Sequence, residues 1–148
     1  MRTQSRFGFG RVEMTPKATK SEARKRILCV DDDFDTREMM SVLLEEYGYE
    51  PVIAGSVTEA IASASSGGIS LCILDHFLSQ GNGVELCRQI RALAPETAIM
   101  FYSGAGYTTD IQAALDAGAQ AYLVKPDFTH LKPTIDRLIY EAAPAKHS

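Results

Sequence analysis

From residue 26 onward, short apolar segments alternate along the chain with longer segments whose apolar residues recur at helical spacing. The apolar segments are rich in residues that favour strands, and they cover residues 26–30, 51–54, 70–74, 98–102 and 121–124. The helical segments cover residues 35–48, 56–67, 84–93, 109–117 and about 131–142. Five strands that alternate with five helices predict an α/β fold in which helices cover both faces of a parallel sheet.

Local signals predict where several helices begin. Asp35 followed by Glu38, and Ser56 followed by Glu59, have the spacing of a capping box, so we expect a helix to begin at each pair. Pro133 should lie in the first turn of the last helix, where its missing N–H is tolerated.

Charge divides the chain into a basic start and an acidic remainder. The net charge is −4, but residues 1–26 carry eight basic and two acidic side chains, while the rest carries seven basic and seventeen acidic ones. We expect a disordered basic arm over residues 1–25, one domain over residues 26–142 and a short tail over residues 143–148. The acidic charge of the domain argues against nucleic acid as a direct ligand.

Cysteine usage and hydropathy favour a cytoplasmic protein. Cys29, Cys72 and Cys87 each lie in an apolar segment and lack Cys-x-x-Cys spacing, so we expect buried free thiols. The sequence has no Cys/His cluster with ligand spacing, which argues against a zinc site. No apolar stretch approaches the ~20 residues of a membrane span, and the basic N-terminus lacks the apolar region of a signal peptide. We therefore expect no membrane insertion.

Polar residues follow four of the five predicted strands. The carboxyl ends of parallel strands share one edge of the sheet, and ligands bind at that edge in open α/β sheets. The second strand ends at Gly55, which offers no reactive group. The other strands are followed by acids, a hydroxyl and an ammonium group, carried by Asp31, Asp32, Asp33, Asp75, Ser103 and Lys125.

This set of side chains suits phosphoryl transfer. Clustered carboxylates raise each other's pKa, so a cation must compensate them. Lys125 supplies one positive charge, and Mg²⁺ would supply two while needing only a few carboxylates, water and a phosphate. A carboxylate can attack phosphorus, and a metal ion, a lysine and a hydroxyl can stabilise the transferring group. Asp75 follows the central strand, between the other acids and Ser103, so we predict that it is the nucleophile.

Four stretches carry a specific resemblance. Val30–Asp33, Leu74–Gly83, Ser103 after its apolar strand, and Tyr122–Pro126 stand in the order and spacing found in receiver domains of two-component response regulators. The chain resembles this family over residues 26–142. The resemblance implies the flavodoxin-like fold with strand order 2-1-3-4-5, the order that chemotaxis receivers have.

The resemblance assigns roles around a metal ion. Asp31 and Asp32 are similar to the acid pair that holds Mg²⁺, and the backbone carbonyl of Phe77 is similar to the third protein ligand. Asp75 is similar to the phosphoryl acceptor, which also contacts the metal. The phosphoryl donor would be a histidine kinase or a His-containing phosphotransfer protein. Such a domain promotes its own phosphorylation and dephosphorylation and is not a conventional enzyme.

The resemblance also implies a switch. Ser103 is similar to the hydroxyl that bonds the phosphoryl group, and Lys125 to the phosphate-binding lysine, joined to Pro126 by a peptide bond that is usually cis in the family. Tyr122 is similar to the aromatic residue that turns inward when the hydroxyl moves, although it could also be a simple core residue. A downstream partner would then bind the face formed by the fourth helix, the fifth strand and the last helix.

Four residues depart from the usual family pattern. Ser79 replaces a proline and should loosen the loop after the acceptor, and Gly104 replaces an alanine and could widen access to the phosphoryl group. Phe77 is bulky at a position that overhangs the phosphate. His76 is unusual beside the acceptor, and the alternation of side chains along a strand predicts that it points away from Asp75.

Alternative interpretations have less support. Asp31, Asp33 and Asp35 alternate as in a calcium loop, but position six lacks the required glycine and position twelve the required glutamate. Asp33 and Asp35 could instead cap the helix, a role that we favour for Asp35. A pseudo-receiver that binds partners without phosphorylation is the main functional alternative. Because few residues follow the last helix, we expect no output domain, so the protein would act by binding, onward phosphotransfer or draining a kinase of phosphate.

Overall fold

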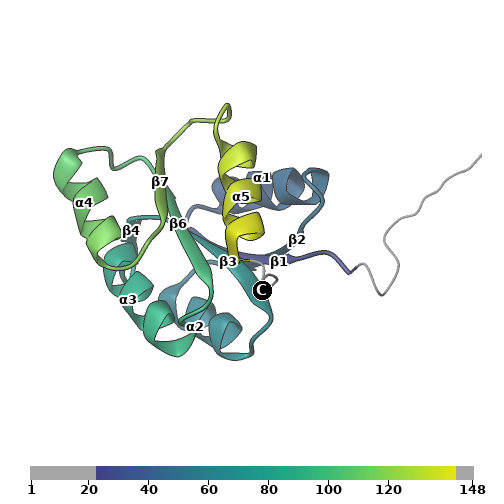
Figure 1. Ribbon diagram of the computed structural model, residues 1–148. Coiled ribbons are helices and arrows are strands. Elements are labelled where there is room, and N and C mark those ends of the chain that lie inside the picture. Colours follow the sequence, from purple (N-terminus) through teal and green to yellow (C-terminus); the bar gives the residue numbers. More distant parts are fainter. Residues whose placement is uncertain (1–22, 143–148) are drawn as a thin grey trace, which may run out of the picture.

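A computed structural model describes residues 23–142, and within them five parallel strands form one sheet (Figure 1). The strand order is β2-β1-β3-β6-β7, which is the predicted order 2-1-3-4-5 when the strands of this sheet are counted along the chain. The strands are β1 (Arg26–Val30), β2 (Glu50–Ala54), β3 (Ile69–Leu74), β6 (Ala98–Ser103) and β7 (Ala121–Val124). The predicted fold is therefore confirmed.

Helices cover both faces of this sheet, as the apolar strands predict (Figure 1). The five helices are α1 (Phe34–Glu46), α2 (Val57–Ser65), α3 (Gly83–Leu93), α4 (Thr108–Asp116) and α5 (Leu131–Ala142). One core joins α2, α3 and α4 to one face, and a second core joins α1 and α5 to the other. Alternate residues of β1 face opposite cores, with Leu28 in the first and Ile27 and Cys29 in the second.

The first helix begins two residues before the predicted capping box. Asp33 is its N-cap, and a carboxylate oxygen of Asp33 accepts hydrogen bonds from the backbone N–H and the hydroxyl of Thr36. Asp35 lies in the first turn instead, so the preference for Asp35 as the cap was wrong. The second helix begins at Ser56 as predicted, since the hydroxyl of Ser56 accepts from the backbone N–H of Glu59.

A small hairpin follows β3 and was not predicted. Strand β4 (Phe77–Leu78) pairs with the antiparallel strand β5 (Gly81–Asn82), and Ser79 lies in the turn between them. The side chain of Asn82 then caps α3 by accepting from the backbone N–H of Glu85. The hairpin therefore connects the end of the central strand directly to the start of a helix.

Arg91 forms hydrogen bonds with several loops at the amino edge of the sheet. Its guanidinium donates to the backbone carbonyls of Pro95, Thr97 and Gly118 and to the side chain of Gln120. These acceptors belong to the segments that lead into β6 and β7, and Gly118 lies just after α4. One side chain from the last turn of α3 therefore fixes the end of α4 to the entry of two strands.

Cys29, Cys72 and Cys87 are buried and free, and burial raises the pKa of Cys87 to about 11. Among residues 23–142, no helix is long and apolar enough to cross a membrane. The expected arm, apart from residues 23–25, and the expected tail over residues 143–148 lie outside the described residues.

Candidate functional site

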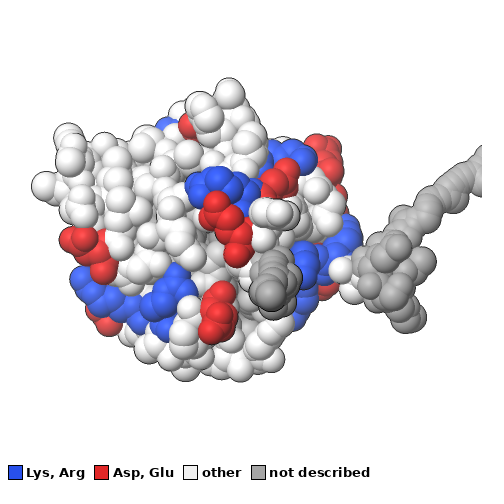
Figure 2. Space-filling view, in the orientation of Figure 1, with Lys and Arg blue, Asp and Glu red and all other residues white. Residues whose placement is uncertain are grey.

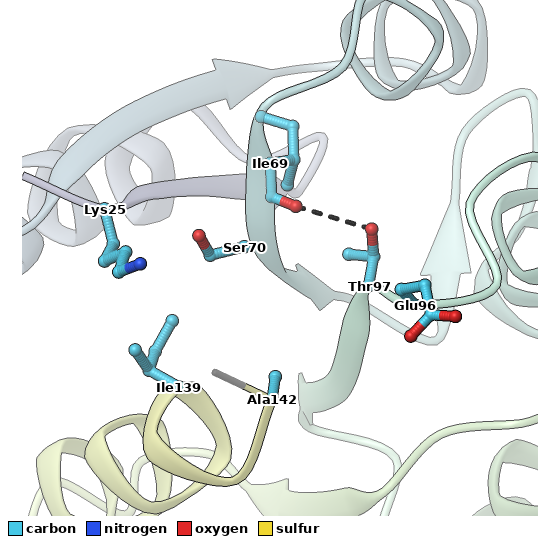
Figure 3. Close-up of a pocket in the computed structure, with 7 residues that line it drawn as sticks. All are labelled: Lys25, Ile69, Ser70, Glu96, Thr97, Ile139 and Ala142. Atoms are coloured by element: carbon cyan, nitrogen blue, oxygen red, sulfur yellow. Dashed lines mark hydrogen bonds between the residues drawn. The ribbon is translucent and has the colours of Figure 1, made fainter. Parts of the chain in front are cut away.

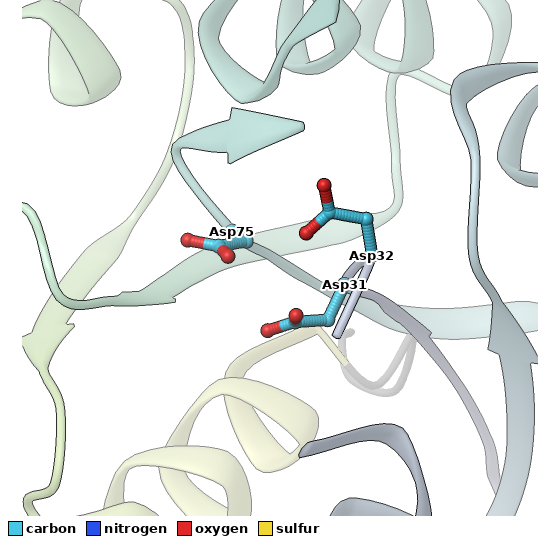
Figure 4. A group of neighbouring side chains, drawn as sticks. All are labelled: Asp31, Asp32 and Asp75. Carbon is cyan, nitrogen blue, oxygen red and sulfur yellow. The ribbon is translucent and has the colours of Figure 1, made fainter. Parts of the chain in front are cut away.

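Three carboxylates meet at the carboxyl edge of the sheet (Figure 4). Asp31 and Asp32 follow β1, and Asp75 follows the neighbouring strand β3, so the two strand ends bring them together. One oxygen from each of the three side chains lies within 4.8 Å of the others. Asp31 is buried, Asp32 is exposed and Asp75 is half-buried, so the cluster opens to solvent on the side of Asp32.

The buried carboxylate of Asp31 has two defined partners. One oxygen accepts from the backbone N–H of Asp33 at 2.9 Å, and the other accepts from the ammonium of Lys125 at 2.7 Å. Burial raises the pKa of Asp31, the hydrogen bond from Lys125 opposes that shift, and the charge of Asp75 adds to it. The ionised cluster is therefore only partly compensated by protein groups.

Lys125 reaches the cluster from the end of β7. Its ammonium lies 3.6 Å from a carboxylate oxygen of Asp75, and the Lys125–Pro126 peptide bond is cis, as expected. Burial lowers the pKa of Lys125, but the hydrogen bond to Asp31 and the charge of Asp75 outweigh burial and raise it above its ordinary value. Lys125 is therefore a fixed positive charge between two acids.

Asp75 has one oxygen bonded to the main chain and one that faces Lys125. The backbone N–H of His76 donates to Oδ1 at 2.8 Å, and Oδ2 is the atom nearest the ammonium of Lys125. The side chain is 14% exposed, which leaves a path for an incoming group. The backbone behind it is closely packed, because a Cβ on Gly83 would lie 2.0 Å from the carbonyl oxygen of Asp75.

Ser103 and Tyr122 lie on β6 and β7, the two strands that follow β3 across the sheet. Ser103 is buried at the end of β6, and its Oγ accepts from the backbone N–H of Ala105 at 3.2 Å. The hydroxyl of Tyr122 donates to the carbonyl of Ala105 at 2.6 Å. Its ring stacks on Phe101, with 5.4 Å between ring centroids, so Tyr122 already lies inward in this structure.

His76 is the residue of this region whose contacts sequence reasoning missed. Its side chain is 8% exposed, and its Nδ1 lies 3.2 Å from the hydroxyl of Tyr122. The ring contacts that the structure records run to Tyr122, Phe101, Phe77 and Asp110. Because these partners other than Phe77 are at least 25 residues away in the sequence, no local pattern could have indicated them.

The donor set fits a hard divalent ion. The cluster offers oxygen atoms only, it carries more negative than positive charge, and it is open to water at Asp32. These are the properties that Mg²⁺ prefers, since it keeps several waters and uses few carboxylates. The predicted backbone ligand, the carbonyl of Phe77, stays a prediction.

A cavity of about 430 Å³ lies away from this cluster (Figure 3). It is lined by residues at the start of β3 and just before β6 and by the end of α5, including Ser70, Thr97 and Ile139. That is the amino edge of the sheet, opposite Asp75. The cavity is therefore separate from the carboxylate site.

The parallel sheet with this order and the acid cluster at its carboxyl edge are typical of a receiver domain. The sequence model of the response regulator receiver domain matches residues 27–136, and the chain belongs to this family. The structure is similar to a CheY-like receiver domain protein of Methanospirillum hungatei, with a TM-score of 0.77, 30% identity and coverage of 81% of this chain and 97% of that chain. It is also similar to TrrA of Thermotoga maritima in complex with Mg²⁺-BeF, with a TM-score of 0.70, 34% identity and coverage of 77% and 98%.

Sequence relatives belong to longer proteins. The DNA-binding response regulator MtrA of Mycobacterium tuberculosis is 33% identical over 103 residues, which are 70% of this chain and 45% of MtrA. The alginate biosynthesis transcriptional regulatory protein AlgB of Pseudomonas aeruginosa is 34% identical over 108 residues, 73% of this chain and 24% of AlgB. The chain thus matches less than half the length of either relative.

Proposed function

We propose that this protein is a phosphorylatable switch of a two-component pathway and that Asp75 is the acceptor. The observation that carries the proposal is the ammonium of Lys125 held between Asp31 and Asp75, beside an open cluster of three carboxylates. A site with this charge pattern suits an incoming phosphoryl group bound together with a divalent ion. The donor would be the phosphohistidine of a histidine kinase or of a phosphotransfer protein.

In the proposed reaction, a carboxylate oxygen of Asp75 forms a bond to phosphorus. The P–N bond to the donor histidine breaks, and its electron pair returns to the imidazole nitrogen. Lys125 neutralises charge on the transferring oxygens, and the hydroxyl of Ser103 donates to one of them. Asp31, Asp32, Asp75 and the carbonyl of Phe77 would hold Mg²⁺, which when bound supplies further positive charge to the phosphoryl oxygens.

The proposed output is a change at the face made by α4, β7 and α5. Ser103 would move toward the phosphoryl group and alter the space beside Tyr122. Figure 2 shows that the surface over α4 and β7 carries few charges. Exposed apolar side chains lie on this face and beside it, namely Tyr107, Leu115, Val124 and Tyr140. Such a surface suits a protein partner better than nucleic acid.

The switch would work in the cytoplasm, where kinases and phosphotransfer proteins of this type deliver phosphate. It would act through partner binding, onward phosphotransfer or removal of phosphate from a kinase. A pseudo-receiver that works without phosphorylation is the alternative, and the same experiment separates the two.

The test is incubation with acetyl phosphate and Mg²⁺, followed by intact-mass measurement over time. We expect the mass of one phosphoryl group to appear and then decay as the acyl phosphate hydrolyses. Asp75→Asn should prevent the gain, because an amide is a poor nucleophile, whereas Asp116→Asn on the surface should not. Labelling of Asp75→Asn at the normal rate would move the acceptor elsewhere, and no labelling of the wild type by acetyl phosphate or phosphoramidate would favour the pseudo-receiver.

A further inference from the structure

The imidazole of His76 lies between the aromatic residue of β7 and the start of α4. Its Nδ1 is 3.2 Å from the hydroxyl of Tyr122, and its Nε2 is 3.8 Å from Oδ1 of Asp110. The other oxygen of Asp110 accepts from the backbone N–H of Tyr107 at 3.3 Å, at the N-terminus of α4. One nearly buried ring therefore joins β7 to the first turn of α4.

The single hydroxyl proton of Tyr122 settles the direction of the first of these bonds. That proton is donated to the carbonyl of Ala105, at the short distance of 2.6 Å. The tyrosine oxygen can then only accept from His76, so Nδ1 of His76 carries a proton and donates. Ala105 accepts the proton of this hydroxyl and His76 donates to its oxygen, while a hydrogen bond from Ser103 opposes the burial that raises the pKa of Tyr122.

His76 also contacts the predicted acceptor through its main chain. Its backbone N–H donates to Oδ1 of Asp75 at 2.8 Å, while its side chain points toward Tyr122 and Asp110. A change at the carboxylate of Asp75 that alters this backbone bond would therefore shift the ring that touches Tyr122. This connection does not pass through Ser103.

We propose that His76 is a positioning residue for Tyr122: it holds the ring inward and couples its position to α4. The coupling part of this inference rests on the proposed function, since it assumes that Asp75 is modified. The holding part concerns the unmodified protein alone. The alternative is that His76 only fills space in the core beside Phe101; the centroids of the two rings are 5.9 Å apart.

Two substitutions distinguish a residue that holds the ring of Tyr122 from one that only fills space in the core. His76→Leu fills a similar volume without a donor, whereas His76→Asn keeps an N–H donor near the position of Nδ1. In the unmodified protein, NMR couplings of Tyr122 should report one inward χ1 rotamer for the wild type and for His76→Asn. His76→Leu should populate a second, outward rotamer, with a matching change in the Tyr122 ¹³Cζ shift. Identical rotamer populations in wild type and His76→Leu would overturn the holding role.

A double-mutant cycle tests the coupling to α4. Beryllofluoride with Mg²⁺ stands in for the phosphoryl group, and ¹⁹F NMR verifies that each variant binds it. We expect His76→Leu and Tyr122→Phe each to reduce the amide shift changes at residues 107–111 by at least about half. The double variant should show no smaller shift changes than Tyr122→Phe alone, because the effects of two linked residues are not additive. Additive losses, or an unchanged response in His76→Leu, would overturn the coupling.

The two measurements also separate this inference from the proposed function. If the wild type binds neither beryllofluoride nor phosphate, the proposed function and the coupling both fail. The rotamer measurement needs no phosphoryl donor, so it still decides whether His76 holds Tyr122. If the wild type responds normally and His76→Leu behaves like it in both measurements, only the role of His76 is refuted.

Discussion

Lys125 binds Asp31 more closely than it approaches Asp75: its ammonium is 2.7 Å from the first carboxylate and 3.6 Å from the second. The closer partner is the more buried one, because the side chain of Asp31 is 4% exposed and that of Asp75 is 14% exposed. In the protein without a bound cation, the lysine therefore compensates the acid that water reaches least. Its role in stability can be separated from its role in phosphoryl chemistry.

Replacement of Lys125 by methionine should destabilise the protein most when divalent ions are absent. The change leaves Asp31 buried without its cationic partner, which should lower the free energy of unfolding by about 2 kcal/mol. Urea unfolding in EDTA and in saturating Mg²⁺ would measure the effect, and Mg²⁺ should recover part of the loss. Lys132→Met is a matched control, because Lys132 forms an exposed pair with Asp136 on α5 that should contribute less than about 1 kcal/mol. Equal losses in the two variants would contradict this account of Asp31.

Asp32 should contribute to metal affinity with little effect on stability, since it is the exposed member of the cluster. Asp32→Asn should weaken Mn²⁺ or Mg²⁺ binding by about tenfold or more, equivalent to about 1.4 kcal/mol. Paramagnetic broadening of amide signals by Mn²⁺ would locate the site at the ends of β1 and β3. Asp35→Asn, in the first turn of α1, should bind metal like the wild type. Broadening centred elsewhere would show that the ion does not use this cluster.

Gly83 should be far less tolerant of alanine than Gly104. A Cβ on Gly83 would lie 2.0 Å from the backbone oxygen of Asp75 and 2.9 Å from the ring of Phe101, so Gly83→Ala must displace the acceptor segment. We expect a loss of about 3 kcal/mol, at the upper end of the cost of overpacking. Gly104→Ala meets no atom within 4 Å and should change stability by less than about 0.5 kcal/mol. Chemical denaturation of both variants checks the contrast, which would be refuted by similar losses.

Asp136 should contribute to the loss of stability in acid. Burial raises its pKa, but hydrogen bonds from Lys132 and Tyr49 outweigh burial and lower it below the ordinary value of 3.8. A carboxylate with a lowered pKa in the folded state stabilises that state above the ordinary value, and the contribution is lost as pH falls through the lowered value. The difference in unfolding free energy between wild type and Asp136→Asn should therefore be constant near neutral pH and shrink below pH 3.8. A difference that stays constant into acid would contradict the shift.

Ser103→Ala tests the switch separately from the acceptor. The variant should still accept phosphate at Asp75, because the nucleophile is intact, but its response around Tyr122 should be weaker. Backbone chemical shifts of wild type and variant, each with beryllofluoride and Mg²⁺, would measure the response. Ser103→Thr keeps the hydroxyl and should respond more like the wild type. Equal responses in wild type and Ser103→Ala would refute the switch and leave the acceptor assignment standing.

The sheet and the place of the carboxylates could be predicted because both depend on local pattern. A strand such as β3 is buried on both faces, so its residues form a short apolar run, and parallel strands place their following residues at one edge. The order and spacing of Asp31, Asp75 and Lys125 therefore carried most of the information about the site.

The start of α1 and the hairpin could not be fixed in the same way. Asp33 and Asp35 both suit an N-cap, and the sequence does not show that the backbone N–H of Thr36 donates to Asp33, which makes Asp33 the cap. The strands of the hairpin have two residues each, too few to display alternation. The contact between His76 and Tyr122 spans 46 residues and depends on tertiary packing.

The two ends of α4 are held in different ways, because the hydrogen bonds of Arg91 reach only the C-terminal end. At the C-terminal end of α4, the guanidinium of Arg91 donates to the carbonyl of Gly118. The same guanidinium bonds the segments that lead into β6 and β7. At its N-terminal end, the first turn meets the body of the domain through side chains, among them the 3.8 Å approach of Asp110 to His76. If α4 rotates about the end that Arg91 holds at Gly118, the largest displacement falls at the opposite end, beside the exposed ring of Tyr107.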